Sequence, residues 1–373
     1  MIKTKYNIGV VGAGGFSRFA MSEFIKNSKV AFVGVYDTDT DKSQRFAQYF
    51  KGTLYKSYSE LLTSNDIDIV YIATPPYLHF EQSMQGLKAG KHVICEKPVS
   101  FNYEDSIKLK SVANECGLLF VVNLMQRYNP LYEQVKEILN SKVLGEFLHG
   151  FMENYASDQS LSPEHWFWDP NMSGGIFIEH GVHFFDLFSG WLGKGHLINS
   201  VELFRKGTQI EDKVADRVQA TVKYPKGIVN FYHGFDQADR FDRQEFRLLF
   251  ERGDITLFEW VPTRYVLNAL VNDQQYNNLS KILSPDNVVF KDIYDKKTVM
   301  RSRFKDYKVD LAIEFTGGEL VIKEDRYRQM LGDFLEDQIK WIEDNKHERK
   351  ITAQNAIDSI EMAINAHNGA ITI

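Results

Sequence analysis

Cysteine is scarce in this sequence, with only Cys95 and Cys116 among 373 residues. Two thiols exclude a framework of several disulfides and a zinc site built from four cysteines. A chain with so few cysteines fits a reducing compartment, and we expect a cytoplasmic location. The first residues lead directly into a strand-like apolar stretch, which does not fit a secretory signal peptide.

The sequence also lacks a long hydrophobic run and a strong excess of one charge. Its apolar runs are far shorter than the roughly 18 residues that a membrane-spanning helix needs. Lys and Arg number 44 against 50 Asp and Glu, which gives a net charge of −6. A weakly acidic chain has no general attraction for nucleic acid or an anionic membrane, so we expect neither as a partner.

The first third of the chain alternates short apolar strands with helix-forming stretches. Strands are predicted at 7–11, 30–36, 67–73, 92–95 and 118–123. Parallel strands covered by helices on both faces are apolar at nearly every position. We therefore predict an α/β domain over residues 1–125, with a doubly wound parallel sheet of the Rossmann type.

After residue 126 the strands become longer and alternate between apolar and polar residues. Such alternation is typical of an antiparallel sheet with one buried face. The strands are predicted at 146–154, 198–206, 216–224, 227–235, 244–250 and 255–260. Hairpin turns at 224–227 and 252–254 favour a meander. We assign residues 126–373 to a second, α+β domain with a large, open, mostly antiparallel sheet.

Helices complete this second domain. They are predicted at 130–139, 179–191, 327–344 and 353–368, and the last is expected to pack back on the first domain. Residues 268–298 are polar and irregular, so we expect a loop or an insertion there.

A glycine-rich turn follows the first strand and opens the first helix. In this turn Gly12 permits a tight bend, and Gly14 and Gly15 let the backbone approach a pyrophosphate at the helix N-terminus. Ser17 stands where the dinucleotide fingerprint has a third glycine, and it is still small enough for close helix–strand packing. We expect this turn, with Phe16, to bind a dinucleotide. The alternative is an ordinary loop before a core helix.

Asp37 ends the second strand, about twenty residues after Ser17, where the fingerprint has an acidic residue. A carboxylate at this point accepts hydrogen bonds from the adenosine ribose and repels a 2′-phosphate. No arginine flanks it. The sequence therefore favours NAD over NADP and makes residues 1–125 an NAD-binding domain.

Two later strand ends point to the same crevice, because ligands bind beyond the carboxyl ends of parallel strands. One is followed by Thr74, Pro75 and His79, which we expect to lie beside the cofactor, although a packing role for His79 is equally open. The other is followed by Glu96 and Lys97. A lysine at this edge can hold a substrate oxygen and help to move its proton.

The segment 173–186 combines a double glycine with two histidines and two acids. On a helix Glu179 and His183 share a face, with His180 beside them and Asp186 one turn further on. A histidine near a carboxylate is a plausible proton carrier. A metal site and a packed helix with satisfied polar groups are the alternatives, and we predict no metal because no distant third ligand is evident.

These motifs together resemble the Gfo/Idh/MocA oxidoreductase family, of the glucose–fructose oxidoreductase and inositol dehydrogenase type. The glycine turn, the Ala73-Thr74-Pro75 strand end, Glu96-Lys97-Pro98 and the Gly174-Gly175…His183 segment occur in the family's order. The resemblance spans nearly the whole chain. It implies a Rossmann domain followed by a domain with an open sheet.

The resemblance further implies that Lys97 is the catalytic lysine and His183 the substrate-facing histidine. The family usually has Asp where this chain has Glu179, and often a Trp-Arg pair where it has Trp168 and Asp169. We therefore assign catalysis to Lys97, His183 and Glu179. Glu96 and Lys97 join the cofactor-binding set.

The resulting hypothesis is hydride transfer between a nicotinamide and a secondary alcohol or ketone of a sugar, inositol or related polyol. Arg127 and Tyr128, just after the last Rossmann strand, are expected to bind substrate together with His180. The aromatic stretch around Trp168 favours stacking on a sugar face, and packing is an equally good account of it.

Three alternatives stay open: an NAD-dependent glycosidase with transient C3 oxidation, a non-catalytic NAD-binding regulator, and an enzyme acting on a non-sugar substrate. We also predict a homodimer or homotetramer. The alternating apolar positions of the large sheet, Val218, Ala220, Val222, Val229 and Phe231, are expected to pair with those of a second copy.

Overall fold

The computed structural model describes residues 4–162, 164–204, 214–296, 298–302, 305–318 and 320–372. The chain forms two compact units. Unit 1 comprises Met1–Tyr128, Pro163–Asp186 and Tyr327–Asn368, and unit 2 comprises Asn129–Ser162, Leu187–Arg326 and Gly369–Ile373. The chain thus leaves unit 1 three residues beyond the predicted boundary and returns to it twice.

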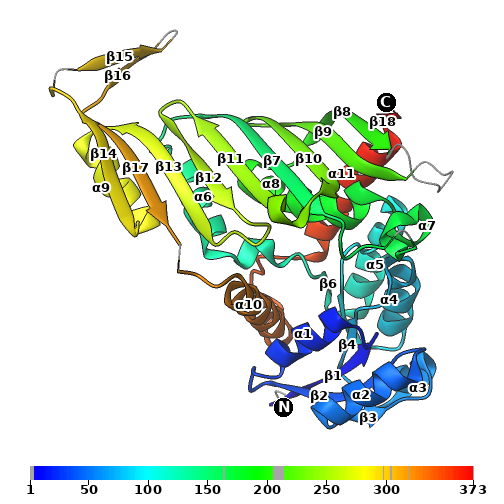
Figure 1. Ribbon diagram of the computed structural model, residues 1–373. Helices are drawn as coiled ribbons and strands as arrows, with labels where there is room; N and C mark the ends of the chain where they lie inside the picture. Colours follow the sequence, from blue (N-terminus) through cyan, green and yellow to red (C-terminus); the bar gives the residue numbers. More distant parts are fainter. Residues whose placement is uncertain are drawn as a thin grey trace. The chain divides into compact units, whose positions relative to one another are not determined.

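Unit 1 contains a parallel sheet of six strands in the order β3-β2-β1-β4-β5-β6 (Figure 1). The strands are β1 (Tyr6–Val11), β2 (Val30–Tyr36), β3 (Thr53–Leu54), β4 (Ile69–Ile72), β5 (His92–Cys95) and β6 (Phe120–Val122). The order reverses between β1 and β4, which creates the crevice at which Rossmann-type sheets bind ligands. The predicted doubly wound parallel sheet is confirmed.

Helices connect these strands and pack against the sheet. They are α1 (Gly15–Phe24), α2 (Thr40–Phe50), α3 (Tyr58–Thr63), α4 (His79–Lys88) and α5 (Tyr103–Cys116), with 3₁₀ turns η1 (Pro76–Leu78) and η2 (Met125–Tyr128). The strands β1 and β4 are almost wholly buried because helices cover both of their faces.

The returning segments of unit 1 are mainly helical. They contain η3 (Trp166–Trp168), α7 (Pro170–Ser173), η4 (Phe177–Gly181), the start of α8 (Val182–Leu192), most of α10 (Lys323–Glu343) and α11 (Ala353–Asn368). The final helix has its predicted bounds and packs against α5 and β6.

Unit 2 contains a sheet of ten strands in the order β14-β17-β13-β12-β11-β7-β10-β9-β8-β18. The strands are β7 (Phe147–Ser157), β8 (His196–Phe204), β9 (Ala215–Tyr224), β10 (Gly227–Gln237), β11 (Arg243–Phe250), β12 (Gly253–Phe258), β13 (Arg264–Val271), β14 (Asn287–Ile293), β17 (Leu311–Gly317) and β18 (Ala370–Thr372). The large, mostly antiparallel sheet is confirmed. The last two residues of the predicted strand 198–206 lie outside the described residues.

The predicted meander is only partly right. The strands β8, β9 and β10 form one meander and β11, β12 and β13 another, but β7 lies between them and pairs in parallel with β10. One continuous meander does not form, because β7, which precedes both meanders in the sequence, is inserted between β11 and β10 in the sheet.

The prediction of a loop over 268–298 is wrong. The strand β13 continues to Val271, and α9 (Asp273–Leu283) and β14 follow. The side chain of Asn272 accepts a hydrogen bond from the Gln275 backbone and the Gln275 side chain bonds back, so a capping box starts the helix. Only Leu279 and Leu283 of α9 are buried, and such a polar helix resembles a loop in hydropathy.

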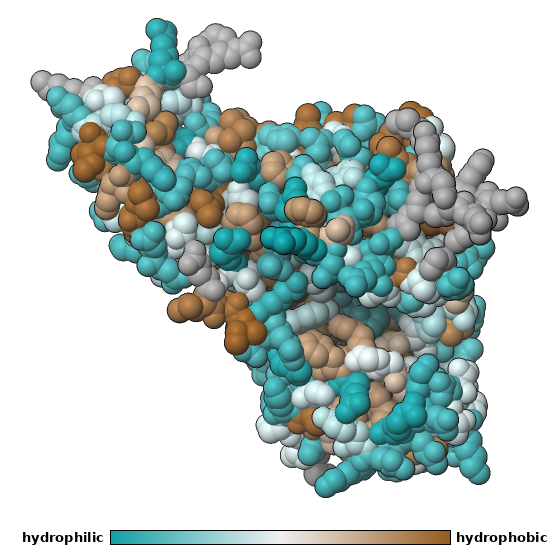
Figure 2. Space-filling view, viewed as in Figure 1, coloured by the Kyte–Doolittle hydropathy of each residue, from teal (hydrophilic) through white to brown (hydrophobic). Residues whose placement is uncertain are grey.

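The remaining elements of unit 2 are α6 (Pro130–Ser141), a 3₁₀ turn η5 (Asp239–Phe241) and a hairpin of β15 (Val299–Ser302) and β16 (Lys305–Lys308). Figure 1 shows this hairpin projecting beyond the β14 edge of the sheet. In Figure 2 hydrophilic residues cover most of the surface in view, and hydrophobic residues form small scattered groups, which is an ordinary pattern for a folded protein.

The alternating apolar face of the sheet is covered within the chain itself. Val218, Ala220, Val222, Val229 and Phe231 are all 0% exposed. The ring of Phe188 packs edge-on against Phe231 at 5.1 Å between centroids, and it stacks near Phe246 at 6.5 Å. The expected pairing of this face with a second copy is therefore wrong, because helix side chains already exclude water from it.

Candidate active site

The glycine turn of unit 1 has the geometry that an anion site requires. Gly12 has φ +96°, and a Cβ on it would lie 2.4 Å from the Ala73 carbonyl oxygen, so only glycine fits. Gly14 precedes α1 without a side-chain cap, and a Cβ at Gly14 or Gly15 would meet nothing within 4 Å. The first N–H groups of α1 are thus approachable by a phosphate. These residues fit the pyrophosphate of a dinucleotide.

The predicted neighbours of this turn pack beneath and beside it. Ser17 is buried and its hydroxyl donates to the Gly14 carbonyl at 2.9 Å, so it serves packing as expected. The ring of Phe16 lies 6.0 Å from that of Tyr327 and 6.3 Å from that of Phe19. This aromatic group joins α10 to α1 directly after the turn.

Asp37 is held at the end of β2 by backbone donors. Its Oδ2 accepts from the Ala13 N–H at 2.6 Å, and its Oδ1 accepts from the Asp39 N–H at 2.8 Å. The carboxylate is therefore fixed beside the glycine turn and remains partly exposed. A carboxylate in this position suits an adenosine ribose.

The residues after β4 form a braced loop. The hydroxyl of Thr74 donates to Gln82 at 2.6 Å, and Pro75 precedes η1. The ring nitrogens of His79 lie 2.7 Å from the Pro98 carbonyl and 2.8 Å from the Thr74 carbonyl. Burial lowers the pKa of this histidine. His79 is 1% exposed and so ties two strand-end loops together.

Glu96 lies at the end of β5 with its carboxylate turned into the protein. Its Oε1 accepts from the Tyr71 hydroxyl at 2.6 Å and from the Asn123 amide at 2.9 Å. Burial raises the pKa of Glu96 to about 6, while these two hydrogen bonds and Lys97 act in the opposite direction. Tyr71 belongs to β4, and Glu96 and Asn123 directly follow β5 and β6.

Lys97 and Glu179 meet although 82 residues separate them. The ammonium of Lys97 donates to the Glu179 carboxylate and, at 2.8 Å, to the Glu179 backbone carbonyl. Their side chains are 18% and 13% exposed, respectively. The structure thus brings two of the three predicted catalytic residues into direct contact within unit 1.

The segment that carries Glu179 is not the regular α-helix that we predicted. It begins with Gly174 and Gly175 at φ +80° and +88°, passes through a π-helical turn at Phe177–Gly181, and becomes α-helical only at Val182. A π turn contains one more residue than an α turn, so the expected i, i+4 alignment of Glu179 with His183 does not hold as stated. Such turns are frequent at functional sites.

Both histidines of this segment are kept neutral, His183 as a buried side chain and His180 as a half-buried one. Burial lowers the pKa of His180 to about 3, and it lowers the pKa of His183 well below the ordinary value, with the Lys97 ammonium acting in the same direction. The ring of His180 packs edge-on against Phe184 at 5.1 Å. A neutral imidazole has a lone pair that can accept a hydrogen bond from a substrate hydroxyl.

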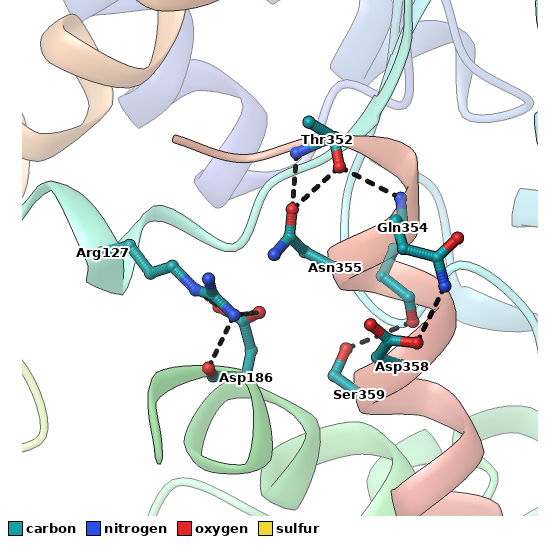
Figure 3. A network of polar contacts seen from close by, with 8 residues as sticks. Arg127, Asp186, Thr352, Gln354, Asn355, Asp358 and Ser359 are labelled. Carbon is teal, nitrogen blue, oxygen red and sulfur yellow. Dashed lines mark hydrogen bonds and ion pairs between the residues drawn. The ribbon is translucent and has the colours of Figure 1, made fainter. Parts of the chain in front are cut away.

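Arg127 binds Asp186, as Figure 3 shows. Its Nε and Nη2 donate to the two carboxylate oxygens at 2.9 and 2.7 Å, and Nη2 also donates to the Asp186 carbonyl at 2.9 Å. Asp186 is 1% exposed, and burial raises its pKa. Asp358 of α11 adds to this increase, and Figure 3 places it within the same polar group.

The hydroxyl of Tyr128 is likewise hydrogen-bonded within the protein. Its hydroxyl donates to Asp337 at 2.5 Å and accepts from Gln338 at 3.2 Å, both in α10. His347 contacts the other oxygen of Asp337 at 2.7 Å. These contacts favour a structural role for Tyr128, and the polar groups of Arg127 are also engaged by the protein.

Trp168 belongs to the compact aromatic turn η3. It is 8% exposed, and its ring packs edge-on against Phe167 at 4.9 Å. The following helix α7 lies against η1, the turn after β4. The residues predicted to stack on a sugar are therefore mostly engaged in packing.

Tyr71 and Asn123 are site residues that the sequence analysis missed. The sequence does contain a signal for Tyr71, because it is the one side chain with a polar atom in the buried strand Ile69–Ile72. A hydroxyl in such a strand needs a partner, and Glu96 provides it.

Within the described ranges no group of three or more His, Cys, Asp or Glu side chains could hold a metal ion. Over the same part of the chain no helix is long and apolar enough to cross a membrane.

A Rossmann sheet with an open glycine turn, and a lysine–glutamate pair beside a neutral histidine, together define an NAD(P)-dependent oxidoreductase. The comparisons give the family. Residues 6–124 match the oxidoreductase family with an NAD-binding Rossmann fold, and residues 132–256 match the GFO/IDH/MocA C-terminal domain. The chain belongs to the Gfo/Idh/MocA family, which confirms the resemblance.

Two curated relatives illustrate the range of the family. Oxidoreductase P35 of Formosa agariphila is 27% identical over 76% of this chain and 89% of its own length. A dTDP-3,4-didehydro-2,6-dideoxy-alpha-D-glucose 3-reductase of Actinomadura kijaniata is 29% identical over 47% of this chain, and the match spans about half of that enzyme (53%).

Solved structures share the fold over the full length. Levoglucosan dehydrogenase in complex with NADH and L-sorbose has a TM-score of 0.77 at 16% identity, covering 98% of this chain and 97% of that one. The 3-ketoreductase KijD10 from Actinomadura kijaniata, with NADP and TDP-benzene, has a TM-score of 0.75 at 18% identity, covering 99% of each chain.

Proposed function

We propose that this enzyme transfers a hydride between NAD(H) and a secondary alcohol or ketone of a sugar, inositol or related polyol. The observation that carries the proposal is the contact of Lys97 with Glu179, beside a buried and neutral His183, in the unit that holds the glycine turn. The two sugar-acting relatives named above support the substrate class.

Each residue has a defined task in this proposal. A bound nicotinamide supplies the hydride acceptor or donor. In the oxidation direction His183 accepts the hydroxyl proton of the substrate, because its imidazole is neutral. The Lys97 ammonium holds the same oxygen and favours the negative charge that develops on it. Glu179 keeps that ammonium oriented.

The preference for NAD over NADP is part of the proposal and rests on Asp37. Its carboxylate is fixed beside the glycine turn by the Ala13 and Asp39 N–H groups. In this position it offers acceptors to ribose hydroxyls and repels a 2′-phosphate. The solved relatives contain either NADP or NADH. The preference for NAD is therefore argued from Asp37 and not from these relatives.

The Lys97→Ala variant tests the proposal. Turnover with a polyol found by an NADH absorbance screen of sugars and inositols should fall at least about 100-fold, since proton-transfer groups contribute that much. The variant should still bind NAD. Unchanged turnover would contradict the assignment of Lys97.

The same screen separates the alternatives. Redox-neutral cleavage of a nitrophenyl glycoside without added cofactor would identify an NAD-dependent glycosidase. Tight NAD binding with no turnover of any polyol or glycoside would favour a regulator.

A further inference from the structure

The charges around Lys97 do not cancel. The site contains two carboxylates, Glu96 and Glu179, and one ammonium, that of Lys97, which is bound to Glu179. His180 and His183 are kept neutral by burial, which lowers the pKa of both. Once Lys97 and Glu179 offset each other, the carboxylate of Glu96 is the surplus charge.

The other groups that face Glu96 are neutral as well. Burial raises the pKa of the Tyr71 and Tyr327 hydroxyls and of the Cys95 thiol, so all three stay protonated. Asn123 is uncharged, and burial lowers the pKa of His79 on the adjoining loop. Among the described residues the cluster therefore carries a net charge of −1 when Glu96 is ionised.

The order of the strands places this charge on one half of the proposed cofactor site. Asp37, at the end of β2, and the glycine turn, at the end of β1, suit the adenosine ribose and the pyrophosphate. The strands β4 and β5 follow on the other side of β1. A dinucleotide bound across the switch point would extend its nicotinamide half over them, and Glu96 and Lys97 directly follow β5.

We propose that the Glu96 carboxylate, fixed by Tyr71 and Asn123, makes this site bind the oxidised dinucleotide more tightly than the reduced one. The inference rests on the proposed function. An oxidised nicotinamide ring carries one positive charge and a reduced ring carries none. In a largely buried site a carboxylate favours the cationic ring, because the low local dielectric strengthens the attraction.

The preference depends on pH in a defined direction. Burial raises the pKa of Glu96 to about 6. Above that pH the carboxylate is ionised and the preference for the oxidised form is present. As the pH falls through about 6, Glu96 takes up a proton and the preference is lost.

The test measures the dissociation constants of NAD⁺ and NADH by titration calorimetry for three forms of the full chain. In Glu96→Gln the ratio of the NADH constant to the NAD⁺ constant should fall at least about fivefold relative to the original chain, as expected for one charge at a partly buried site. In Asp41→Asn, which removes an equal charge from the exposed face of α2, the ratio should stay the same.

A second variant remains informative if Glu96→Gln folds poorly. Tyr71→Phe keeps the carboxylate but removes the hydroxyl that donates to it. The pH at which the ratio falls should move upward, which loss of packing alone would not cause. A ratio unaffected by both variants, with both cofactors still bound, overturns the inference and leaves the proposed function intact. Binding of neither cofactor to the original chain overturns both.

Discussion

At the scale of single residues, the chemistry depends on which groups are charged in a buried place. Lys97 keeps its ammonium among histidines because Glu179 pairs with it, whereas burial and the neighbouring Lys97 cation lower the pKa of His180 and His183. The Lys97 cation directly after β5 thus lies close to a segment that holds the Glu179 anion and two neutral histidines.

This arrangement predicts that acid destabilises the fold. An unfolded chain protonates His180 near its ordinary pKa of 6.5, but the folded protein does so only at about 3. The stability from neutral His180 is therefore present above 6.5 and is lost as the pH falls from 6.5 toward 3. His92, with a pKa lowered by burial to about 4, acts in the same direction. Glu96, whose pKa is raised, acts in the opposite direction between about 6 and 4.5.

Urea unfolding between about pH 7 and pH 5 measures this effect, which amounts to at most about 1.4 kcal/mol per pH unit for each histidine. The variant His180→Gln should show a shallower fall in the free energy of unfolding than the original chain. An equal slope in both would show that His180 is not kept neutral by folding.

A second prediction at this scale concerns Asp37. Replacement by serine removes the charge that repels a 2′-phosphate, so the ratio of kcat/KM for NADP to that for NAD should rise at least about tenfold. Both cofactors should bind more weakly, because the Ala13 N–H loses its acceptor.

The matched control is Asp39→Asn in the same loop. Its carboxylate caps α2 by accepting from the Lys42 N–H at 3.0 Å, so the variant should leave the cofactor ratio nearly unchanged. A similar rise in both variants would mean that general charge, not the position of Asp37, sets the preference.

At the scale of elements, the double glycine and the π-helical turn determine where Glu179 lies. Gly174 ends α7 in a left-handed conformation, and a Cβ there would lie 2.7 Å from Ile178 and 2.9 Å from Phe101. The turn therefore packs closely against Phe101, in the segment after β5. This packing places Glu179 next to Lys97. Sequence patterning finds the glycines and the polar residues but not the extra residue in the turn.

The variant Gly174→Ala should lower the free energy of unfolding by about 2–4 kcal/mol, from the positive φ and the overlap together. Gly90→Ala is the control, since Gly90 also has a positive φ of +75° but open space around it. It should cost only about 1 kcal/mol. Chemical denaturation compares the two. Equal losses would show that crowding at Gly174 contributes nothing.

At the scale of the whole molecule, the large sheet carries exposed apolar side chains on the face opposite its buried positions. The register places Ile228, His149 and Leu249 side by side across β10, β7 and β11. Ile228 and Leu249 are each 41% exposed. We therefore propose that a homodimer or homotetramer forms through this outer face and not through the alternating buried positions.

Small-angle scattering tests the assembly. The original chain should scatter as a dimer or tetramer, and Ile228→Asp should shift it toward monomer, because burying an unpaired charge at an interface is costly. Ile107→Asp on α5, at a residue that is 42% exposed, should leave the assembly unchanged. A monodisperse monomer for the original chain would contradict the proposal.

The sequence by itself determined the features that depend on local patterning. These are the apolar parallel strands, the glycine turn with its acidic partner and the hairpins of the large sheet, because a period of hydrophobicity or a turn residue acts over a few positions. The final helix, Ala353–Asn368, was found at its observed bounds for the same reason.

Only the tertiary structure decided which polar atoms meet. It paired Lys97 with Glu179, Arg127 with Asp186, and Tyr128 with Asp337, across separations that no local pattern encodes. It also turned Glu96 into a buried carboxylate held by Tyr71 of β4 and by Asn123, directly after β6. The physical reason is that a buried charge must find partners wherever packing places them, and packing is a property of the folded chain.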